Sequence, residues 1–195
     1  MRIFLAGASG VIGVRLVPLL VAAGHVVAGM TRSQDKADGL RSIGADAVVC
    51  DVYDADAFRE AAVAFGAEAV VHQLTDLPDD QASIPRFEAA NARIRREGTR
   101  NLLAAARACG ASRIVAQSVA WDLGGDAGAA VREHERAVLG SGGVVVRYGQ
   151  LYGPGTYFED EEPSPPRIHV DEAARRTVPA LDAPPGLMLV TEDGG

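Results

Sequence analysis

The sequence predicts an α/β domain built on a doubly wound parallel sheet, and three observations support that fold class. Short apolar segments alternate with longer amphipathic segments through most of the 195 residues. A glycine closes each of several amphipathic segments just before the next apolar one, as glycine commonly does after a helix. A glycine-rich turn follows the first apolar segment directly. This alternation is typical of parallel strands joined by right-handed helical crossovers.

The individual elements follow from these segments in chain order. Strands are expected over residues 3–6, 25–30, 47–50, 69–72, 113–116 and 143–147. Helices are expected over residues 10–23, 34–43, 54–65, 84–109 and 127–140. After residue 147 the alternation stops, and residues 158–166 are acidic and proline-rich, which predicts a mobile loop. A short helix at 170–181 and a brief strand at 187–190 complete the chain.

The glycine turn predicts a dinucleotide-binding site. In a Rossmann-type sheet, glycines at this spacing allow a tight turn, a close approach of the backbone to a pyrophosphate and close helix packing. The turn follows a strand and opens a helix, which is the context this interpretation requires. A tight turn without a ligand is the alternative. The turn residues assigned to cofactor binding are Gly7, Ser9, Gly10, Val11, Ile12 and Gly13.

These features predict one domain over residues 1–195. Its Rossmann-type, dinucleotide-binding core is expected at 1–147, and a small, shortened C-terminal substrate-binding subdomain at 148–195. The net charge of −7 disfavours nucleic-acid and anionic-membrane partners, so a small-molecule substrate is expected. Cys50 and Cys109 have no disulfide or metal-ligand spacing, and no metal is expected. No secretory pattern or membrane-length apolar run is present, which favours a cytoplasmic location.

The end of the second expected strand selects the cofactor. An acidic side chain at this place would bind the ribose 2′-hydroxyl of NAD, whereas an arginine would bind the 2′-phosphate of NADP. The sequence here has Thr31 and Arg32 without an acid, and Lys36 lies one helical turn further on. A charge-assisted hydrogen bond of about 1.5–3 kcal/mol corresponds to roughly a ten- to hundredfold preference. NADP(H) is therefore expected rather than NAD, with a solvated Arg32 as the alternative.

Several later segments complete a resemblance to a known family. They are VVH at 70–72, Asn91 followed by GTRNLLAAA at 98–106, RIVAQS at 113–118 and RYGQLYGPG at 147–155. With the glycine turn, this set resembles the extended short-chain dehydrogenase/reductase family, in its NAD(P)-dependent epimerase/dehydratase-like branch. The resemblance covers about residues 1–155 and again 168–181. It implies a Rossmann sheet with the active site beyond the carboxyl ends of the strands.

The resemblance assigns further residues to the cofactor. Asp51 would bind the adenine amino group and Val52 would pack on the ring, although an Asp51 that only stabilises a turn is an open alternative. The remaining assignments are Gln73, Leu74 and Thr75 near the pyrophosphate and ribose, Asn91 on the long helix and Gln150 near the nicotinamide. His72 is expected to be a buried, hydrogen-bonded residue rather than a catalyst.

The catalytic pattern of the family is incomplete. The family uses a Ser or Thr, a Tyr and a Lys, and Ser118 lies where that serine is expected. If Glu135 is the glutamate that follows the Tyr-x-x-x-Lys pair, Ala127 and Val131 occupy the Tyr and Lys positions. Tyr148 and Tyr152 are assigned as replacements, and packing against cofactor or substrate is the alternative for both. His134 is expected at the surface.

The resemblance implies an NADP(H)-binding oxidoreductase or epimerase/dehydratase-like enzyme that acts on a carbonyl or hydroxyl group of a small molecule. The missing pair keeps two alternatives open. One is a non-catalytic NADP-binding redox sensor or assembly partner, and the other is a non-redox cyclase or isomerase on the same scaffold. By resemblance, the helices at 84–109 and 127–140 are faces for a possible homodimer.

Overall fold

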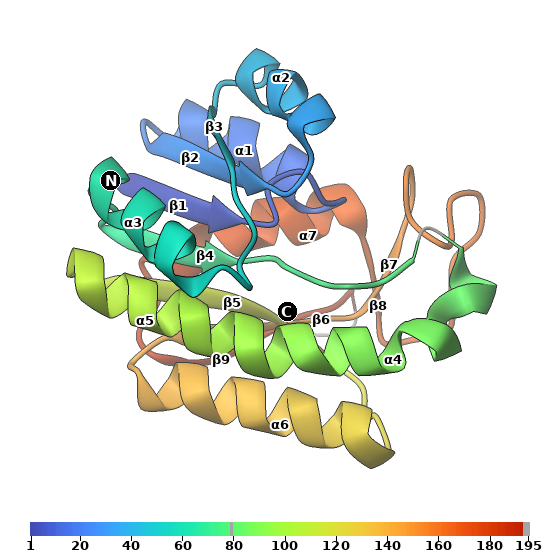
Figure 1. Cartoon of the computed structure of the whole chain (residues 1–195). Coiled ribbons are helices and arrows are strands. Elements are labelled where there is room, and N and C mark those ends of the chain that lie inside the picture. Colours follow the sequence, from blue (N-terminus) through green and yellow to red (C-terminus); the bar gives the residue numbers. More distant parts are fainter. Residues whose placement is uncertain (79, 193–195) are drawn as a thin grey trace.

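A seven-stranded parallel sheet forms the centre of the protein (Figure 1), as seen in a computed structural model that describes residues 1–78 and 80–192. Its strand order is β3-β2-β1-β4-β5-β6-β9. The strands are β1 (Arg2–Ala6), β2 (Val26–Thr31), β3 (Asp46–Val49), β4 (Ala69–His72), β5 (Arg113–Val119), β6 (Val144–Tyr148) and β9 (Gly186–Val190). The order reverses beside β1, where β2 lies on one side and β4 on the other. The predicted doubly wound sheet is confirmed, and its switch point is at the end of β1.

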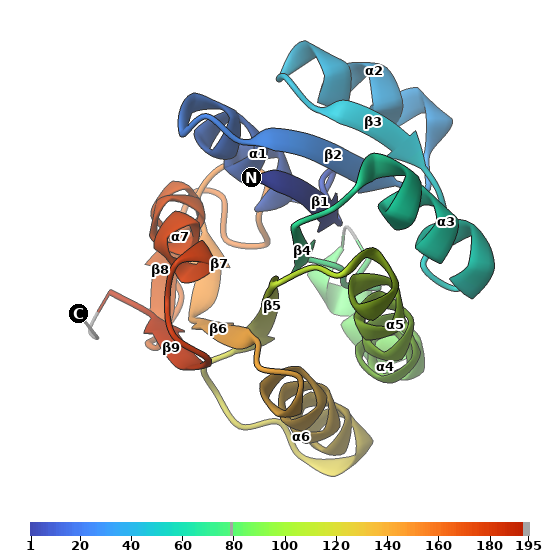
Figure 2. The same ribbon diagram turned by 90° about the vertical axis from the view of Figure 1, so that its left-hand side faces the viewer.

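Helices cover both faces of the sheet (Figure 2). One face carries α1 (Gly13–Ala22), α2 (Gln34–Ser42), α7 (Val170–Thr177) and the 3₁₀ turn η3 (Val178–Leu181). The other face carries α3 (Ala55–Phe65), α5 (Thr99–Cys109) and α6 (Gly125–Gly140). Along β1, Ile3 and Leu5 join the first core and Phe4 joins the second, because successive side chains of a strand point to opposite faces.

The helix expected over 84–109 is continuous in space but changes its winding. It begins after the short 3₁₀ turn η1 (Gln81–Ser83) as α4 (Ile84–Arg93), passes through one π-helical turn, η2 (Ile94–Gly98), and continues as α5. Such π-turns interrupt the regular hydrogen-bond ladder and often occur at functional sites. The turn η2 packs against α6 and holds Arg95 in the interior.

The C-terminal part of the chain contributes to the same sheet. The strand β9 pairs with β6 in parallel and forms one sheet edge, while α7 packs against α1. A separate two-stranded sheet pairs β7 (Gln150–Tyr152) with β8 (Arg167–His169). The last three residues of the predicted 148–195 subdomain lie outside the described residues. No helix in the described part of the chain is long and apolar enough to span a membrane.

Candidate functional site

The glycine turn connects the end of β1 to the start of α1 at the switch point of the sheet. Gly7 has a φ of 88°, and a Cβ atom there would lie 2.6 Å from the carbonyl oxygen of Gln73. A Cβ atom at Gly13 would lie 2.3 Å from the carbonyl oxygen of Gly7. These two glycines are therefore required by the packing of the turn itself. Gly10 is exposed, and a Cβ atom there would meet only that same oxygen, at 3.3 Å.

The turn presents backbone donors that fit a phosphate. Within residues 1–78 and 80–192, the amide groups of Val11 and Ile12 donate to no protein acceptor. They lie at the N-terminal end of α1, where the helix dipole also favours an anion. With the open side of Gly10 beside them, the backbone can approach a pyrophosphate closely. The unpaired amides are an observation independent of the glycine spacing, and they too fit the pyrophosphate of a dinucleotide.

The end of β2 is organised around Thr31. Its hydroxyl oxygen accepts hydrogen bonds from Ser9 Oγ (3.0 Å) and from the amide of Ser33 (3.2 Å). Arg32 is half exposed and donates through Nη2 to Asp76 Oδ1 at 2.8 Å. Lys36 is exposed on the first turn of α2. The structure therefore places Arg32 and Lys36 beyond the carboxyl end of β2, and Arg32 is already paired with the carboxylate of Asp76.

A polar network that sequence reasoning missed surrounds that carboxylate. Tyr53 donates its hydroxyl proton to Asp76 Oδ2 at 2.7 Å, and the amide of Asp76 donates to Asn91 Oδ1 at 3.4 Å. The Arg93 guanidinium stacks 3.9 Å from the centre of the Tyr53 ring. Burial, followed by the hydrogen bond to Asp76, raises the pKa of Tyr53 above its ordinary value. The only sequence signal for this network is the position of Asp76, four residues beyond β4.

The residues after β3 have mainly structural contacts. The Asp51 carboxylate accepts a hydrogen bond from the amide of Tyr53 at 2.9 Å, which stabilises the turn. The Val52 side chain is buried in the core beneath α3 and α5, and its carbonyl accepts from Asn101 Nδ2 at 2.9 Å. The turn role of Asp51, left open by the sequence, is therefore observed. Contacts of either residue with adenine remain predictions.

The residues after β4 border the glycine turn. The amide of Gln73 donates to the carbonyl oxygen of Ala6 at 2.8 Å, and the carbonyl of Leu74 accepts from Gln117 Nε2 at 3.2 Å. Thr75 is exposed. The segment predicted to lie over the pyrophosphate is thus brought beside the turn by pairing of β4 with β1. Gln150, also assigned to the cofactor, lies on β7 and donates to the carbonyl of Ser164 at 2.8 Å.

The three hydroxyls assigned to catalysis are not gathered in one place. Ser118 is fully buried and donates to Glu135 Oε1 at 2.6 Å. Tyr148 is also buried, and its hydroxyl bonds to Gln73 Nε2 (3.0 Å) and Thr177 Oγ1 (2.6 Å). Tyr152 lies on β7 and donates to Glu192. Each hydroxyl therefore has a protein partner of its own.

The surroundings of the two tyrosine hydroxyls raise their pKa values. Burial raises the pKa of Tyr148 to about 12, and the hydrogen bond to the Glu192 carboxylate raises that of Tyr152 to about 12. Burial would raise the pKa of Glu135, but hydrogen bonds from Arg147 and Ser118 lower it overall. Ala127 and Val131, which the resemblance assigns to the positions of the usual Tyr and Lys, lie in the first half of α6.

Two histidines, His72 on β4 and His134 on α6, form a buried cluster with Thr99. His72 is 1% exposed, as predicted. The expectation that His134 lies at the surface is wrong, because it is also 1% exposed. Thr99 Oγ1 lies 2.7 Å from His134 Nδ1 and 3.3 Å from His72 Nε2, and His134 Nε2 lies 2.9 Å from the carbonyl oxygen of Gln117. The inward face of α6 is therefore wider than its sequence pattern suggests.

One loop packs beside the glycine turn. Arg15 on α1 donates to the carbonyls of Val11 (2.8 Å) and Pro154 (2.6 Å) and pairs with Asp171 (2.6 Å). Tyr157, which lies in the same loop as Pro154, donates to the carbonyl of Pro78. The loop between β7 and β8 is thus tied both to the turn and to the segment after β4.

Comparison with known proteins shows the family of the chain. Residues 7–141 match the family model described as NAD(P)H-binding. The chain belongs to the NAD(P)H-binding family. A relative from Streptomyces, named 3-diazoavenalumate denitrifying reductase, is 38% identical over an alignment of 236 residues that covers 99% of this chain and 76% of the relative. The predicted resemblance to short-chain dehydrogenases/reductases and NAD(P)-dependent epimerases is therefore confirmed.

Solved structures show the same fold at low sequence identity. A UDP-glucose 4-epimerase from Thermotoga maritima has a TM-score of 0.80 at 17% identity, with 98% of this chain and 77% of the epimerase covered. A short-chain dehydrogenase from Streptomyces avermitilis has a TM-score of 0.74 at 19% identity, with 98% and 88% covered. These likenesses establish the family fold, while cofactor choice and substrate need separate arguments.

Proposed function

We propose that this protein is an NADPH-dependent reductase of a small molecule whose reduction needs no proton from an enzyme tyrosine. The observation that carries the proposal is that α6 contains no tyrosine and no lysine; by resemblance, Ala127 and Val131 would occupy the positions of the family's Tyr and Lys. An alkyl side chain can neither donate a proton nor lower the pKa of a neighbour. A substrate with its own leaving group suits such a site better than a carbonyl, which must take up a proton on oxygen.

The residues around the turn suit NADPH in several ways. The free amides of Val11 and Ile12 would hold the pyrophosphate, and Gly10 would allow its approach. Arg32, with Lys36 nearby, would bind the 2′-phosphate, since guanidinium matches phosphate geometry. Gln73, Leu74 and Thr75 would border the ribose through their backbone. When bound, reduced nicotinamide supplies a hydride.

The substrate class that we propose is an aromatic diazo compound in its diazonium form. The relative that is 38% identical is named as a denitrifying reductase of a diazo compound. In such a reduction the carbon gains one hydrogen with its electron pair, while the C–N bonding pair leaves with N₂. Charge and atoms balance without a proton donor. The absence of the Tyr-x-x-x-Lys pair on α6 is compatible with this chemistry.

The test uses NADPH that carries deuterium at the transferable position, together with an aryl diazonium salt. Enzyme-dependent formation of product with deuterium at the carbon that lost N₂ is expected. A reaction without enzyme corrects for spontaneous reduction. Gly10→Ala serves as the matched variant, because its added Cβ blocks the approach of the pyrophosphate but disturbs the fold little. It should raise the KM for NADPH.

The other outcomes separate the alternatives. Turnover of carbonyl compounds but not of diazonium salts would reject the substrate class and retain the reductase. Tight NADPH binding without turnover of either class would instead favour the non-catalytic NADPH-binding protein. That second candidate is supported by one observation, namely that Ser118 and Tyr148 are buried and already hydrogen-bonded.

A further inference from the structure

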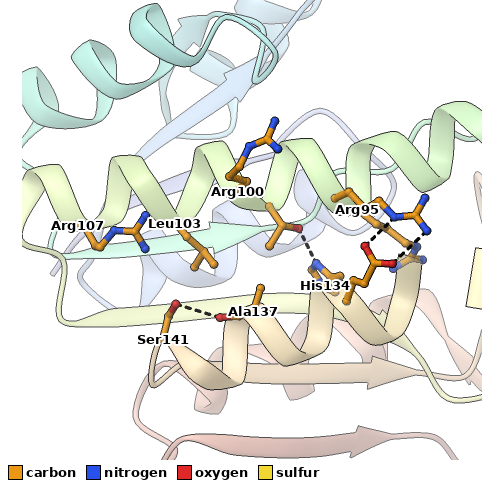
Figure 3. Close-up of a pocket in the computed structure, with 10 residues that line it drawn as sticks. Arg95, Arg100, Leu103, Arg107, His134, Ala137 and Ser141 are labelled. Atoms are coloured by element: carbon orange, nitrogen blue, oxygen red, sulfur yellow. Dashed lines mark hydrogen bonds and ion pairs between the residues drawn. The ribbon is translucent and has the colours of Figure 1, made fainter. Parts of the chain in front are cut away.

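A cavity of about 500 Å³ lies between the helices on the second face of the sheet. It runs between α6 on one side and η2 and α5 on the other (Figure 3). Arg95 and His134 lie at one end of this groove, and Arg107 and Ser141 lie at the other. None of the residues that line it is assigned to the cofactor, so the cavity is distinct from the proposed cofactor site. We call this cavity the α5–α6 groove.

Arg95 is the unusual residue of the α5–α6 groove. Its side chain lines the groove, yet the residue is only 4% exposed. Its Nε and Nη1 atoms are buried and have no hydrogen-bond partner among the described residues. A buried guanidinium without an anion is unfavourable, because desolvation of the charge is not compensated. Unsatisfied buried donors of this kind commonly indicate a ligand, an ion or water.

The neighbouring side chains do not neutralise Arg95. Glu135 is the nearby carboxylate, but its oxygens accept hydrogen bonds from Ser118 (2.6 Å) and from Arg147 (2.8 and 2.6 Å). Burial, with Arg95 as a further cause, lowers the pKa of both His72 and His134, so neither imidazole adds charge at neutral pH. Arg95 is thus a buried cation whose nearest potential counter-ion is already engaged.

The rim of the groove adds positive charge. Arg96, Arg100 and Arg107 line it together with a single acidic residue, Glu133. Arg96 pairs with Glu133 (2.8 Å) and Asp126 (2.6 Å). In the part of the chain that the structure describes, Arg100 and Arg107 form no hydrogen bond or ion pair through their side chains. Such a concentration of arginine in a chain of net charge −7 attracts anions locally.

We propose that the α5–α6 groove binds a phosphate group, with Arg95 as its buried donor and the rim arginines as its electrostatic funnel. The π-turn η2 carries both Arg95 and Arg96, and Arg96 pairs with Glu133. Phosphate oxygens in the groove would accept from the guanidinium of Arg95, whose Nε and Nη1 atoms have no protein partner among the described residues. The group can be inorganic phosphate or part of a small phosphomonoester, since both offer the same oxyanion. The site is a second ligand site, independent of the proposed reductase activity.

The first measurement is thermal unfolding of the whole protein in potassium phosphate against potassium chloride at equal ionic strength. A saturable rise of about 3–6 °C is expected at a phosphate concentration roughly ten times the dissociation constant. Arg95→Met should abolish this rise, and should also raise the melting temperature in chloride because it removes an uncompensated buried charge. Glycerol 3-phosphate as a second probe distinguishes an ester from free phosphate by its tighter binding.

Three further variants isolate the site. Arg107→Gln, at the exposed rim, keeps the test open if Arg95→Met does not fold, and should weaken phosphate binding severalfold. Arg86→Gln, an exposed arginine on α4 that does not line the groove, should leave the response unchanged. Gly10→Ala should also retain it, which separates the groove from the glycine turn. NADPH binding should persist in Arg95→Met.

Several results would overturn the proposal. One is an equal rise in phosphate for wild type and Arg95→Met, which would indicate a general salt effect. Another is a phosphate response lost in Gly10→Ala but not in Arg107→Gln, which would assign it to the turn. A third is a dimer, detected by light scattering, in which phosphate neither binds nor stabilises, because the groove would then be an interface between two copies.

Discussion

Arg32 and Asp76 form an ion pair across the carboxyl edge of the sheet, with Nη2 and Oδ1 2.8 Å apart. Arg32 follows β2, and Asp76 follows β4, so the pair spans the two sides of the switch point. Asp76 is largely shielded, with its side chain 12% exposed, whereas Arg32 is 53% exposed. Arg32, which is expected to bind the 2′-phosphate, is therefore already paired with a carboxylate that would compete with the phosphate.

This pair leads to a prediction about cofactor preference. Asp76→Asn removes the competing charge, so NADPH should bind severalfold more tightly while NADH changes little. Arg32→Gln should reduce the preference for NADPH by roughly ten- to a hundredfold, because one charge-assisted hydrogen bond is lost. Both are measured by calorimetric titration with the two nucleotides. Asp38→Asn, which breaks an exposed pair with Arg41 on α2, is the matched control. An unchanged ratio in both site variants would contradict the assignment of Arg32.

The glycines of the turn should separate stability from binding. Gly13→Ala forces a Cβ atom to 2.3 Å from a backbone oxygen that cannot move freely, and should cost about 2 kcal/mol or more of unfolding free energy. Gly10→Ala meets one oxygen at 3.3 Å and should cost less than about 1 kcal/mol. Urea unfolding measures both changes. Similar losses in the two variants would show that the turn is not built as the structure indicates.

The buried histidine cluster predicts loss of stability in mild acid. Burial first, and Arg95 next, lower the pKa of His134 to about 4, and the pKa of His72 also lies well below its usual range. The unfolded chain therefore binds more protons than the folded one between about pH 6.5 and pH 4, so stability is full above that window and falls within it. Each histidine contributes a slope of up to about 1.4 kcal/mol per pH unit.

Urea unfolding at several pH values between 4 and 7 tests this dependence. His134→Asn should flatten the slope over that window, whatever its effect on stability at pH 7. His25→Asn removes a histidine outside the buried cluster and should leave the slope as in wild type. A slope that persists unchanged in His134→Asn would show that other groups cause the acid sensitivity.

Tyr148 should act through packing rather than proton transfer. Its hydroxyl is buried between Gln73 and Thr177, so Tyr148→Phe should cost about 1–2 kcal/mol of stability by leaving those partners unsatisfied. NADPH-dependent turnover should persist with an unchanged pH profile. Tyr152→Phe, which removes an exposed contact with Glu192, is the comparison. A loss of turnover specific to Tyr148→Phe, with NADPH affinity retained, would restore Tyr148 as the acid.

Much of the fold could be predicted because local signals agree with one another. The glycines that close several helices, the apolar strands and the turn at 7–13 each reflect short-range backbone sterics. The expected strands at 25–30 and 143–147 lie within one residue of β2 and β6. The parallel pair of β7 and β8 was not predicted, because three-residue strands carry too short a pattern.

Only part of the candidate site could be predicted from the sequence. The turn residues and Arg32 lie where the sequence predicts, since their places follow from the strand that precedes each of them. Ser118 and Tyr148 lie at the predicted strand ends, but the side each hydroxyl faces depends on β5 and β6 packing against α6 and α7. A strand alternates its faces, so a residue at the predicted position in a strand can still point to the other face of the sheet.

Sequence alone was enough for the strands of the sheet, for the glycine turn and for the lack of tyrosine and lysine in α6, because each is written within a few consecutive residues. Only the tertiary structure reveals that Asp76 reaches Arg32 over a separation of 44 residues, or that Arg95 is buried with no hydrogen-bond partner for its Nε and Nη1 atoms among the described residues. These features arise where distant segments share a desolvated space. There the energy of a charge depends on its neighbours in three dimensions rather than on its neighbours along the chain.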